Sequence, residues 1–313
     1  MINYYQTQAG RGVPDFDEAP LERQRAGADY IASPALQRAI NLAIFLGQPL
    51  LLTGEPGTGK TELARHLAQR LSPDGALDHF YTFNTKTTST AQDLFYRYDS
   101  LRHFQYAQNR AEPLSDAEVE ARFVQYQALG KAIKSGKRGI VLIDEIDKAP
   151  RDFPNDILDV MTELSFEVPE LGLVGKQRVR TLPENRPIVI MTSNSEKALP
   201  DAFLRRCVFF HIEFPGTDQL QRILSAKGSA FSPTELQKIV AHFQQVRAAC
   251  KRKKPATAEL LQWTMALEQL HRSGELPIDQ LDNAQGAAHD ALIGSYSLLV
   301  KDKEDLKQIR KTR

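Results

Sequence analysis

The stretch GEPGTGKT, residues 54–61, has the residue types and the spacing that hold a chain of phosphates. It fits G-x-x-x-x-G-K-[ST], with an apolar run, LLLTG, before it and a helical pattern, TELARHLAQRL, after it. The glycines let successive backbone N–H groups face phosphate oxygens at a helix N-terminus, where the helix dipole favours anions. A glycine-rich turn without a ligand is the alternative, but the context favours a nucleotide-binding P-loop made of Gly54, Glu55, Pro56, Gly57, Thr58, Gly59, Lys60, Thr61 and Glu62.

Asp144 and Glu145 follow a second apolar run, GIVLI, and stand where a parallel strand delivers groups to a ligand. Lys60 would reach the β- and γ-phosphates, and Thr61 would ligate Mg²⁺. That ion needs a carboxylate beside the threonine hydroxyl, which suits Asp144. Glu145 is then placed to activate a water for attack on the γ-phosphate. The alternative for an adjacent Asp-Glu pair is a solvated turn.

Arg205 and Arg206 stand directly before an aromatic run, CVFFHIEFP. Cationic pairs are normally solvated and apolar runs are normally buried, so the pair needs an explanation. One explanation is a charged cap that stops an edge strand from pairing. The other is a catalytic arginine, whose rigid guanidinium fork a flexible lysine could not replace equally.

Between Tyr30 and about Phe214, short apolar runs alternate with helical stretches. The runs are PLLLTG, FYTFN, GIVLID, PIVIMTSN and CVFFHIEF. Runs of this length without in/out alternation, separated by helices, indicate parallel strands covered on both faces. The first helix is expected to have Ser33 as its N-cap and to end at Gly47. The sequence therefore predicts an α/β layered domain.

The chain divides into three predicted parts. Residues 1–28 are polar and lack periodicity, so they are expected to be a flexible arm. Residues 29–216 form the α/β domain. From 217 to 313 the strands stop and apolar residues recur at helical spacing, which predicts a smaller helical domain.

The 313-residue chain has the composition of an ordinary globular protein, with 42% apolar and 25% charged residues. A net charge of +1 argues against nucleic acid or an anionic membrane as partner, and the run KRKK at 251–254 is better explained as a solvated helix end than as a phosphate-backbone patch. The two cysteines and seven histidines show no metal-ligand or redox spacing. With no apolar leader or spanning segment, the protein is expected to be cytoplasmic and not to contact a membrane.

Five motifs in sequence order resemble the AAA+ ATPases, and within them the MoxR-type, dynein-related branch. The matching stretches are PLLLTGEPGTGKTELA, DLFYRYDSL, VLIDEIDKAPRDFPNDIL, FEVPELG and IVIMTSNSEKALPDAFLRRC. The similarity covers about residues 30 to 270. It implies an AAA+ P-loop NTPase fold, with a parallel five-stranded sheet between helices and a smaller all-helical lid domain, and ATP and Mg²⁺ as cofactors.

The resemblance also implies roles for residues that spacing leaves open. Asn194 resembles sensor 1, which helps to orient the attacking water, although an asparagine there could instead cap a helix. Tyr30 and Ile31 match the segment that lies against the adenine, where core residues would look the same. In rings of this family an arginine from the neighbouring subunit reaches the γ-phosphate. Arg205 or Arg206 occupies that position, and the LRRC alignment favours Arg206.

The chain departs from the family pattern at one position. The family often has an arginine, sensor 2, at the start of a lid helix, where this sequence has Ala256 or Thr257. Either Lys254 serves as sensor 2 or the function is absent, so no residue is assigned to this role.

The segment of about residues 85–137 is too long for a simple connection and includes a capping box at Ser115–Glu118. In related rings such insertions face the central channel. Phe95, Tyr96 and Tyr98 would then grip a partner chain, or, as is more usual for aromatics at this spacing, pack in a core.

These observations predict a Mg²⁺-dependent ATPase of MoxR type, assembled as a homo-oligomeric ring that is expected to be hexameric. The resemblance implies remodelling or assembly of a partner protein, often one of the von Willebrand factor A type. One rival is a nucleic-acid-acting or GTP-using motor, against which the neutral charge counts. A second rival is an ATP-gated scaffold or defence switch with slow turnover, which would keep both Asp144 and Glu145.

Overall fold

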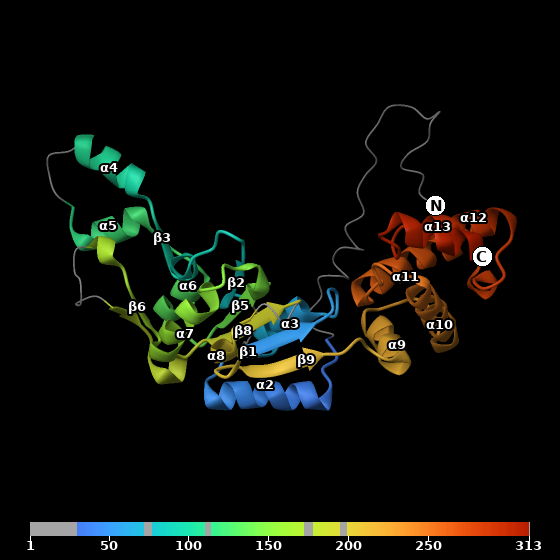
Figure 1. Cartoon of the computed structure of the whole chain (residues 1–313), viewed down its shortest axis with the longest axis horizontal. Helices are drawn as coiled ribbons and strands as arrows, with labels where there is room; N and C mark the ends of the chain where they lie inside the picture. Colours follow the sequence, from blue (N-terminus) through green and yellow to red (C-terminus); the bar gives the residue numbers. More distant parts are fainter. Residues whose placement is uncertain (1–29, 72–76, 110–113, 172–177, 195–198, 313) are drawn as a thin grey trace. The chain divides into compact units, whose positions relative to one another are not determined.

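The computed structural model describes residues 30–71, 77–109, 114–171, 178–194 and 199–312 (Figure 1). The arm predicted for residues 1–28 lies outside them. Two compact units are present. The α/β unit comprises Ala32–Gly54 and Lys60–Ile212. The helical unit comprises Glu213–Arg313, the P-loop tip Glu55–Gly59, and Tyr30 and Ile31, which are the described residues of the segment Met1–Ile31. The domain limits 29–216 and 217–313 stay predictions.

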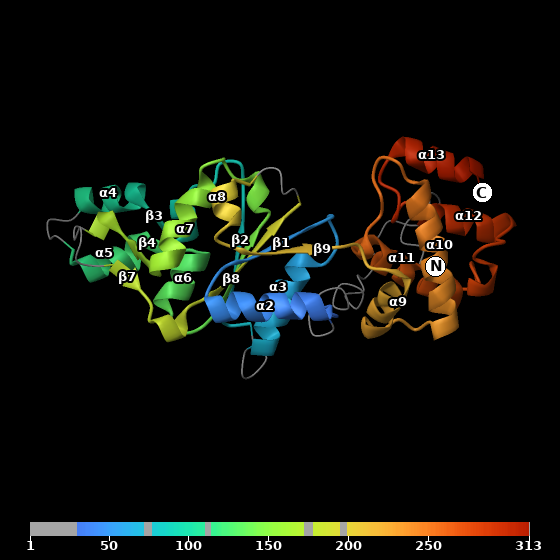
Figure 2. The same cartoon turned by 60° about the horizontal axis from the view of Figure 1, so that its bottom comes forward.

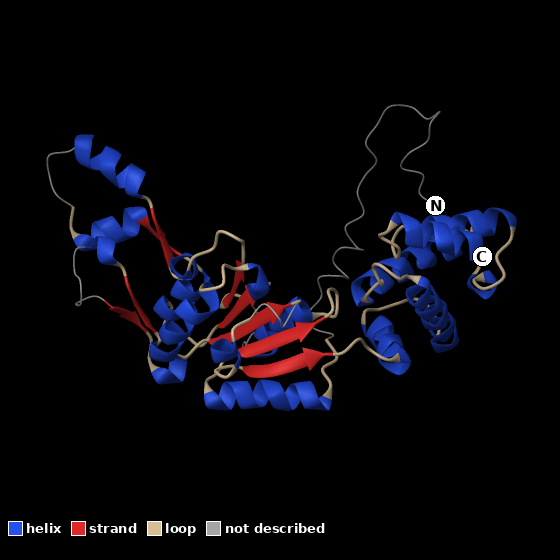
Figure 3. Ribbon diagram, viewed as in Figure 1, coloured by secondary structure: helices blue, strands red, loops and turns tan. Residues whose placement is uncertain are grey.

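The α/β unit consists of a central sheet, two short strand pairs and the helices around them (Figures 1 and 3). The sheet strands are β1 (Leu50–Gly54), β2 (Phe80–Asn84), β5 (Ile140–Asp144), β8 (Ile188–Ser193) and β9 (Val208–Ile212). The short antiparallel pairs are β3 (Tyr96–Tyr98) with β4 (Val124–Tyr126), and β6 (Ser165–Glu167) with β7 (Arg178–Arg180). The α-helices are α2 (Pro34–Leu46), α3 (Lys60–Leu71), α4 (Ser100–Asn109), α5 (Asp116–Phe123), α6 (Ala128–Lys134), α7 (Phe153–Glu163) and α8 (Asp201–Leu204). Single 3₁₀ turns cover Ala91–Leu94, Ile146–Lys148, Pro169–Leu171 and Pro183–Asn185.

The five sheet strands are parallel and lie in the order β2-β5-β8-β1-β9. Within β1, Leu50, Leu51 and Leu52 are at most 1% exposed. Consecutive side chains of a strand point to opposite faces, so both faces of the sheet are covered. The parallel five-stranded sheet predicted from apolar runs without alternation is confirmed.

Capping residues determine where α2 and α5 begin or end, and the ends of α2 and α3 lie at opposite edges of the sheet. Ser33 caps α2, with its Oγ accepting from the Leu36 N–H at 3.2 Å, and Gly47 ends α2 with a φ of 61°. The predicted capping box of Ser115 and Glu118 opens α5. Since α2 leads into β1 through a short turn, its C-terminus lies at the edge where strands start. Helix α3 follows β1 through the P-loop, so it begins at the edge where strands end.

The aromatic residues of the insertion form part of the core. Phe166 of β6 lies against Phe95 and Tyr96, with ring centroids 5.1 and 6.2 Å apart. Phe95 and Tyr96 are 4% and 5% exposed, and Tyr98 is half-buried edge-on to His103. The gripping role considered for Phe95 and Tyr96 is therefore wrong, because these rings are buried in the core of the α/β unit.

The helical unit has a core of its own. Its helices are α9 (Thr217–Ala226), α10 (Pro233–Ala249), α11 (Thr257–Arg272), α12 (Gly286–Ser295) and α13 (Lys303–Thr312) (Figure 2). The core centres on Trp263, Tyr296 and Phe243, all fully buried. Asp305 of α13 accepts hydrogen bonds from the backbone N–H groups of Lys251 and Arg252, each at 3.1 Å. The KRKK run is thus a turn with exposed side chains, tied to α13. No helix in the described ranges is both long and apolar enough to cross a membrane.

Candidate functional site

The P-loop has the backbone conformation of a phosphate cradle. Gly54, Gly57 and Gly59 have φ values of 145°, 76° and 87°, which disfavour any residue with a side chain. A Cβ on Gly57 would come within 2.9 Å of the Ala256 Cβ, and one on Gly59 within 3.1 Å of the Tyr30 ring. Glycine is therefore required at both positions for conformational and steric reasons.

Lys60 begins α3 and is held inside the α/β unit. It is 7% exposed, and its ammonium donates to the Gly54 carbonyl oxygen at 2.8 Å. Burial lowers the pKa of Lys60, while the nearby carboxylates of Asp144, Asp147 and Glu145 act in the opposite direction. A buried ammonium beside carboxylates is suited to compensating the charge of a bound phosphate.

Thr61 and Asp144 come together although 83 residues separate them. The Thr61 hydroxyl lies 3.2 and 3.3 Å from the two Asp144 carboxylate oxygens. A hydroxyl and a carboxylate are the hard oxygen ligands that Mg²⁺ prefers, and Mg²⁺ characteristically takes one or two carboxylates together with phosphate oxygens. The donor set at this position thus fits the ion predicted from the sequence.

Glu145, directly after β5, has a backbone conformation that is unusual for a residue with a side chain. Its φ is 56° and its ψ 50°, in the left-handed region. Its N–H donates to the Thr192 hydroxyl at 2.8 Å, and that hydroxyl donates in turn to Asp144 Oδ1. Thr192 is 1% exposed, so this hydrogen-bonded bridge fixes both acidic residues from the neighbouring strand β8.

Asn194 lies beside Glu145, as a residue that orients the same water would have to. Its Nδ2 donates to Glu145 Oε1 at 3.4 Å, and its backbone N–H donates to Asp147 Oδ1 at 3.3 Å. The other Glu145 oxygen is ion-paired with Lys148. The hydrogen bond to Glu145 raises the pKa of Lys148. The structure therefore brings together Lys60, Thr61, Asp144, Glu145 and Asn194 at the strand-end edge of the sheet.

Sequence reasoning missed Thr192 and Lys148. A signal for Thr192 was present, since it is a polar residue near the end of a mostly apolar strand, β8, and lies two residues before Asn194. Lys148 lies three residues after Glu145 in a 3₁₀ turn, which brings residues at that spacing onto one side.

The P-loop tip has contacts with residues of its own helical unit. Tyr30 lies over Gly59, and the adenine contact expected of Tyr30 and Ile31 stays a prediction. Glu55 forms an ion pair with Arg247 of α10, with 2.6 Å between Arg247 Nη2 and Glu55 Oε2. Ala256, at one of the positions expected for sensor 2, is 5% exposed and packs on Gly57. Arg247 is thus an arginine of the helical unit at the P-loop that the sequence did not single out.

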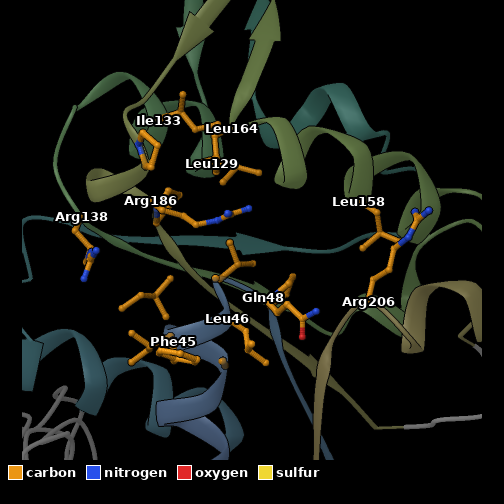
Figure 4. Close-up of a pocket in the computed structure, with 18 residues that line it drawn as sticks. Phe45, Leu46, Gln48, Leu129, Ile133, Arg138, Leu158, Leu164, Arg186 and Arg206 are labelled. Atoms are coloured by element: carbon orange, nitrogen blue, oxygen red, sulfur yellow. The ribbon is translucent and has the colours of Figure 1, made fainter.

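Arg206 and Arg205 lie at the opposite, strand-start edge of the sheet, and both are exposed. Arg206 lines a cavity of about 580 Å³ at this edge, together with residues from α2, α6, α7 and the start of β8 (Figure 4). Arg205 is not among its lining residues. Within one chain, Arg206 therefore lies at the far end of the strands from Glu145.

Comparison with known proteins identifies the family. Residues 49–207 match the model of the AAA domain, dynein-related subfamily. The chain is similar to the "Uncharacterized protein YehL" of Escherichia coli strain K12, at 25% identity over 212 residues, covering 67% of this chain and 53% of that protein. It is also similar to CD-NTase-associated protein 6 of Pseudomonas aeruginosa, at 23% identity over 206 residues, covering 64% of this chain and 58% of the relative.

The chain thus spans somewhat more than half the length of these two curated relatives. Among solved structures, a Thermotoga maritima RuvB variant aligns with a TM-score of 0.47 and 14% identity, over 89% of this chain and 72% of that one. The family match covers both acidic site residues, the P-loop, Asn194 and Arg206. The chain belongs to the AAA domain family, in its dynein-related subfamily.

Proposed function

We propose that this protein is a Mg²⁺-dependent ATP hydrolase of the MoxR type. The observation that carries the proposal is the hydrogen-bonded set of Thr61, Asp144, Thr192, Glu145 and Asn194 beside the buried Lys60. It supplies a metal-ligand pair, a phosphate cation and a carboxylate with an orienting amide. These are the groups that in-line transfer of a phosphoryl group to water requires.

Each residue of this set has a defined task in the proposal. Lys60 and the P-loop N–H groups bind the β- and γ-phosphates. Thr61 and Asp144 would hold Mg²⁺, and the ion would offset charge on the phosphate oxygens. Glu145 accepts a proton from the attacking water, which Asn194 helps to orient. Tyr30 and Ile31 contact the base of the nucleotide. Thr192 keeps Asp144 and Glu145 in fixed relation throughout.

We further propose that the chain works as a homo-oligomeric ring, hexameric by analogy with the family, in which Arg206 serves the site of the next subunit. The exposure of Arg206 at the strand-start edge, away from Glu145, supports an action between subunits. ATP turnover would drive remodelling or assembly of a protein partner, for which a von Willebrand factor A-type protein is the family-based candidate.

A second candidate function is an ATP-gated switch with slow turnover in defence. The similarity to a protein named for its association with a CD-NTase favours this alternative. Both candidates need the same nucleotide site, and they differ in how often it turns over. Repeated turnover that a partner protein stimulates would favour the remodelling enzyme. Less than one turnover during a complete assembly event would favour the switch. Activity that DNA stimulates, or a preference for GTP, would favour a nucleic-acid-acting or GTP-using motor instead.

Glu145→Gln tests the proposal directly. The amide cannot accept the proton, so the variant should bind ATP with wild-type affinity and lose turnover by about 10²-fold or more. Glu184→Gln, an exposed glutamate of a 3₁₀ turn in the same unit, is the matched control and should turn over normally. The trapped ATP state should also retain its partner, which mass spectrometry of the purified complex would identify. Turnover near wild type in Glu145→Gln would assign the base to another residue.

A further inference from the structure

The cavity at the strand-start edge is basic. Its lining includes three arginines, Arg138, Arg186 and Arg206, and none of the described residues that line it is acidic. Figure 4 shows Arg186 extending into the cavity from one side and Arg206 standing at the other side, beside Leu158, with Arg138 farther out. We refer to it as the arginine cavity. Cations gathered around a hollow without a carboxylate lining favour an anionic occupant.

Arg186 has a defined position in this cavity. It lies directly over Gly47, because a Cβ on that glycine would come 3.1 Å from both its Cδ and its Nη1. Gly47 ends α2 in the left-handed conformation, so Arg186 stands at the helix C-terminus, where carbonyl groups favour a cation. Burial lowers the pKa of Arg186, yet a guanidinium stays protonated at neutral pH. A half-buried, oriented guanidinium loses less freedom on binding an anion than a mobile one.

Capping of α2 alone would explain one arginine, but it does not explain the cavity or its rim. A cap requires a cation at the last helical turn, whereas Arg206 reaches the same hollow from the segment before β9. The rim also carries Phe45 and Leu46, which are 84% and 54% exposed. Large apolar side chains at that exposure favour a protein surface as the cover of the cavity.

Charge complementarity identifies that surface. The strand-end edge of the same sheet carries Asp144, Glu145 and Asp147, and it is the edge where ATP phosphates would lie. A basic edge that meets an acidic edge of an identical chain makes a head-to-tail contact, which can close into a ring. At the acidic edge, Asp144, Glu145 and Asp147 each have a partner in their own chain. A bound nucleotide would bring a further anion to this edge, its terminal phosphate, and that phosphate is the group that the arginine cavity would meet.

We propose that the arginine cavity is a phosphate-binding site for the nucleotide of a second copy of this chain, in which Arg186 acts beside Arg206. This inference rests on the proposed function and adds Arg186 as a second cation at the shared site. Two planar guanidinium groups on opposite sides of the cavity can each donate two hydrogen bonds to phosphate oxygens, as one arginine alone cannot do from both sides.

Arg186→Gln is the test variant, because it keeps hydrogen-bonding capacity and removes the charge. Lys137→Gln is the matched control: Lys137 is an exposed cation of the same unit, next to Arg138 in sequence, and it does not line the cavity. We expect Arg186→Gln to bind ATP as wild type does, while self-association with ATP weakens by about 10-fold and turnover falls by about 10- to 100-fold. Lys137→Gln should stay within about 2-fold of wild type in all three measurements.

A second variant separates loss of the charge from damage to α2. Gly47→Ala keeps Arg186 but forces it from its position, so ATP-dependent association should weaken as in Arg186→Gln. Thermal unfolding of each variant reports whether α2 has been disrupted. Should both variants unfold, Arg186→Lys keeps a cation at the helix end without the planar fork, and an association intermediate between wild type and Arg186→Gln is expected. Wild-type association in any folded Arg186 variant would overturn the inference.

Mixing distinguishes a phosphate of a second copy from a free anion. Arg186→Gln subunits can bind ATP but lack the cation, while Lys60→Ala subunits keep Arg186 and should lack ATP. Mixed together, they should recover association and turnover. Inorganic phosphate titrated into wild-type protein is the other arm, and Arg186-dependent phosphate binding without self-association would overturn the role of the second copy. ATP-dependent association without any hydrolysis by wild type would contradict the proposed function and leave this inference standing.

Discussion

The two edges of the central sheet hold their charged side chains in different ways. At the strand-end edge, Asp144 and Glu145 are tied by hydrogen bonds to Thr61, Thr192 and Asn194 of the same chain. At the strand-start edge, Arg186 and Arg206 surround a cavity of about 580 Å³ with an exposed apolar rim. The acidic side chains of the first edge are thus held in place by their own chain, whereas on our proposal the second edge is completed by another molecule.

Loss of Lys60 should have the broadest effect, since it impairs ATP binding and with it every later step, and it should act at the strand-end edge. Lys60→Ala removes a buried ammonium that would donate charged hydrogen bonds worth ~1.5–3 kcal/mol each to phosphate. We expect ATP affinity to fall by at least about 100-fold in calorimetry. Lys137→Ala, an exposed lysine of the same unit, is the control. Unchanged ATP affinity in Lys60→Ala would contradict the P-loop assignment.

Loss of Arg206 should leave ATP binding intact and reduce turnover. In Arg206→Ala we expect a loss on the order of 10³-fold, as for other arginines that act on a neighbour's phosphate. Arg205→Ala, which removes the adjacent arginine outside the cavity, should retain most activity. A strand cap would behave differently, with a modest loss of stability and little kinetic change.

Mixing Arg206→Ala with Glu145→Gln shows whether the two edges act on one site. Each variant is expected to be inactive alone. In a mixed ring, a Glu145→Gln subunit can lend its intact arginine to a neighbour with an intact Glu145, which restores one productive interface. Failure to recover ATPase activity despite proven co-assembly would mean that the strand-start edge has no part in hydrolysis.

Loss of the Thr192 hydroxyl should give the smallest effect and tests how tightly the strand-end edge is fixed. Thr192→Val keeps the shape of the side chain but leaves the Glu145 N–H without its acceptor, at a cost of about 1–3 kcal/mol in unfolding free energy. We expect turnover to fall by about 10-fold with ATP affinity little changed, since misplacing the base costs transition-state stabilisation of ~1.4 kcal/mol. Thr264→Val in the helical unit is the control.

Thr264 is 2% exposed and its hydroxyl donates to the Leu260 carbonyl, so the control variant loses a comparably buried hydrogen bond. It should lose stability without losing turnover. Equal turnover losses in the two variants would show that the effect of Thr192→Val comes from stability alone.

The sequence predicted the elements of the sheet and the P-loop because their signals are local. Runs such as LLLTG and GIVLID lack alternation since both of their faces are buried, and Ser33 and Gly47 mark the ends of α2 by their own backbone chemistry. Strand order is not local. Strand β8 lies between β5 and β1 because of the way the chain crosses over between strands, and no short stretch of sequence indicates those crossovers.

The site was predictable as far as motifs reach. Thr61, Asp144 and Glu145 belong to motifs, so their roles followed from spacing. Thr192 and Arg186 contact residues far away in sequence: Thr192 is hydrogen-bonded to Asp144 and Glu145, and Arg186 lies over Gly47 at the end of α2. For Phe95 and Tyr96 the sequence favoured core packing but left a gripping role open, because an aromatic residue type does not by itself show whether its side chain is buried. Their enclosure depends on Phe166, about 70 residues away.

Glu145 also sets stability against activity at a single position. A residue with a side chain in the left-handed conformation costs roughly 1–2 kcal/mol relative to the ordinary helical region, and glycine largely avoids that cost. Selection of variants for heat resistance alone would therefore favour glycine at this position and discard the proposed base. A thermostable form of this protein that is still active would have to gain its stability elsewhere, in parts of the fold that do not meet the nucleotide.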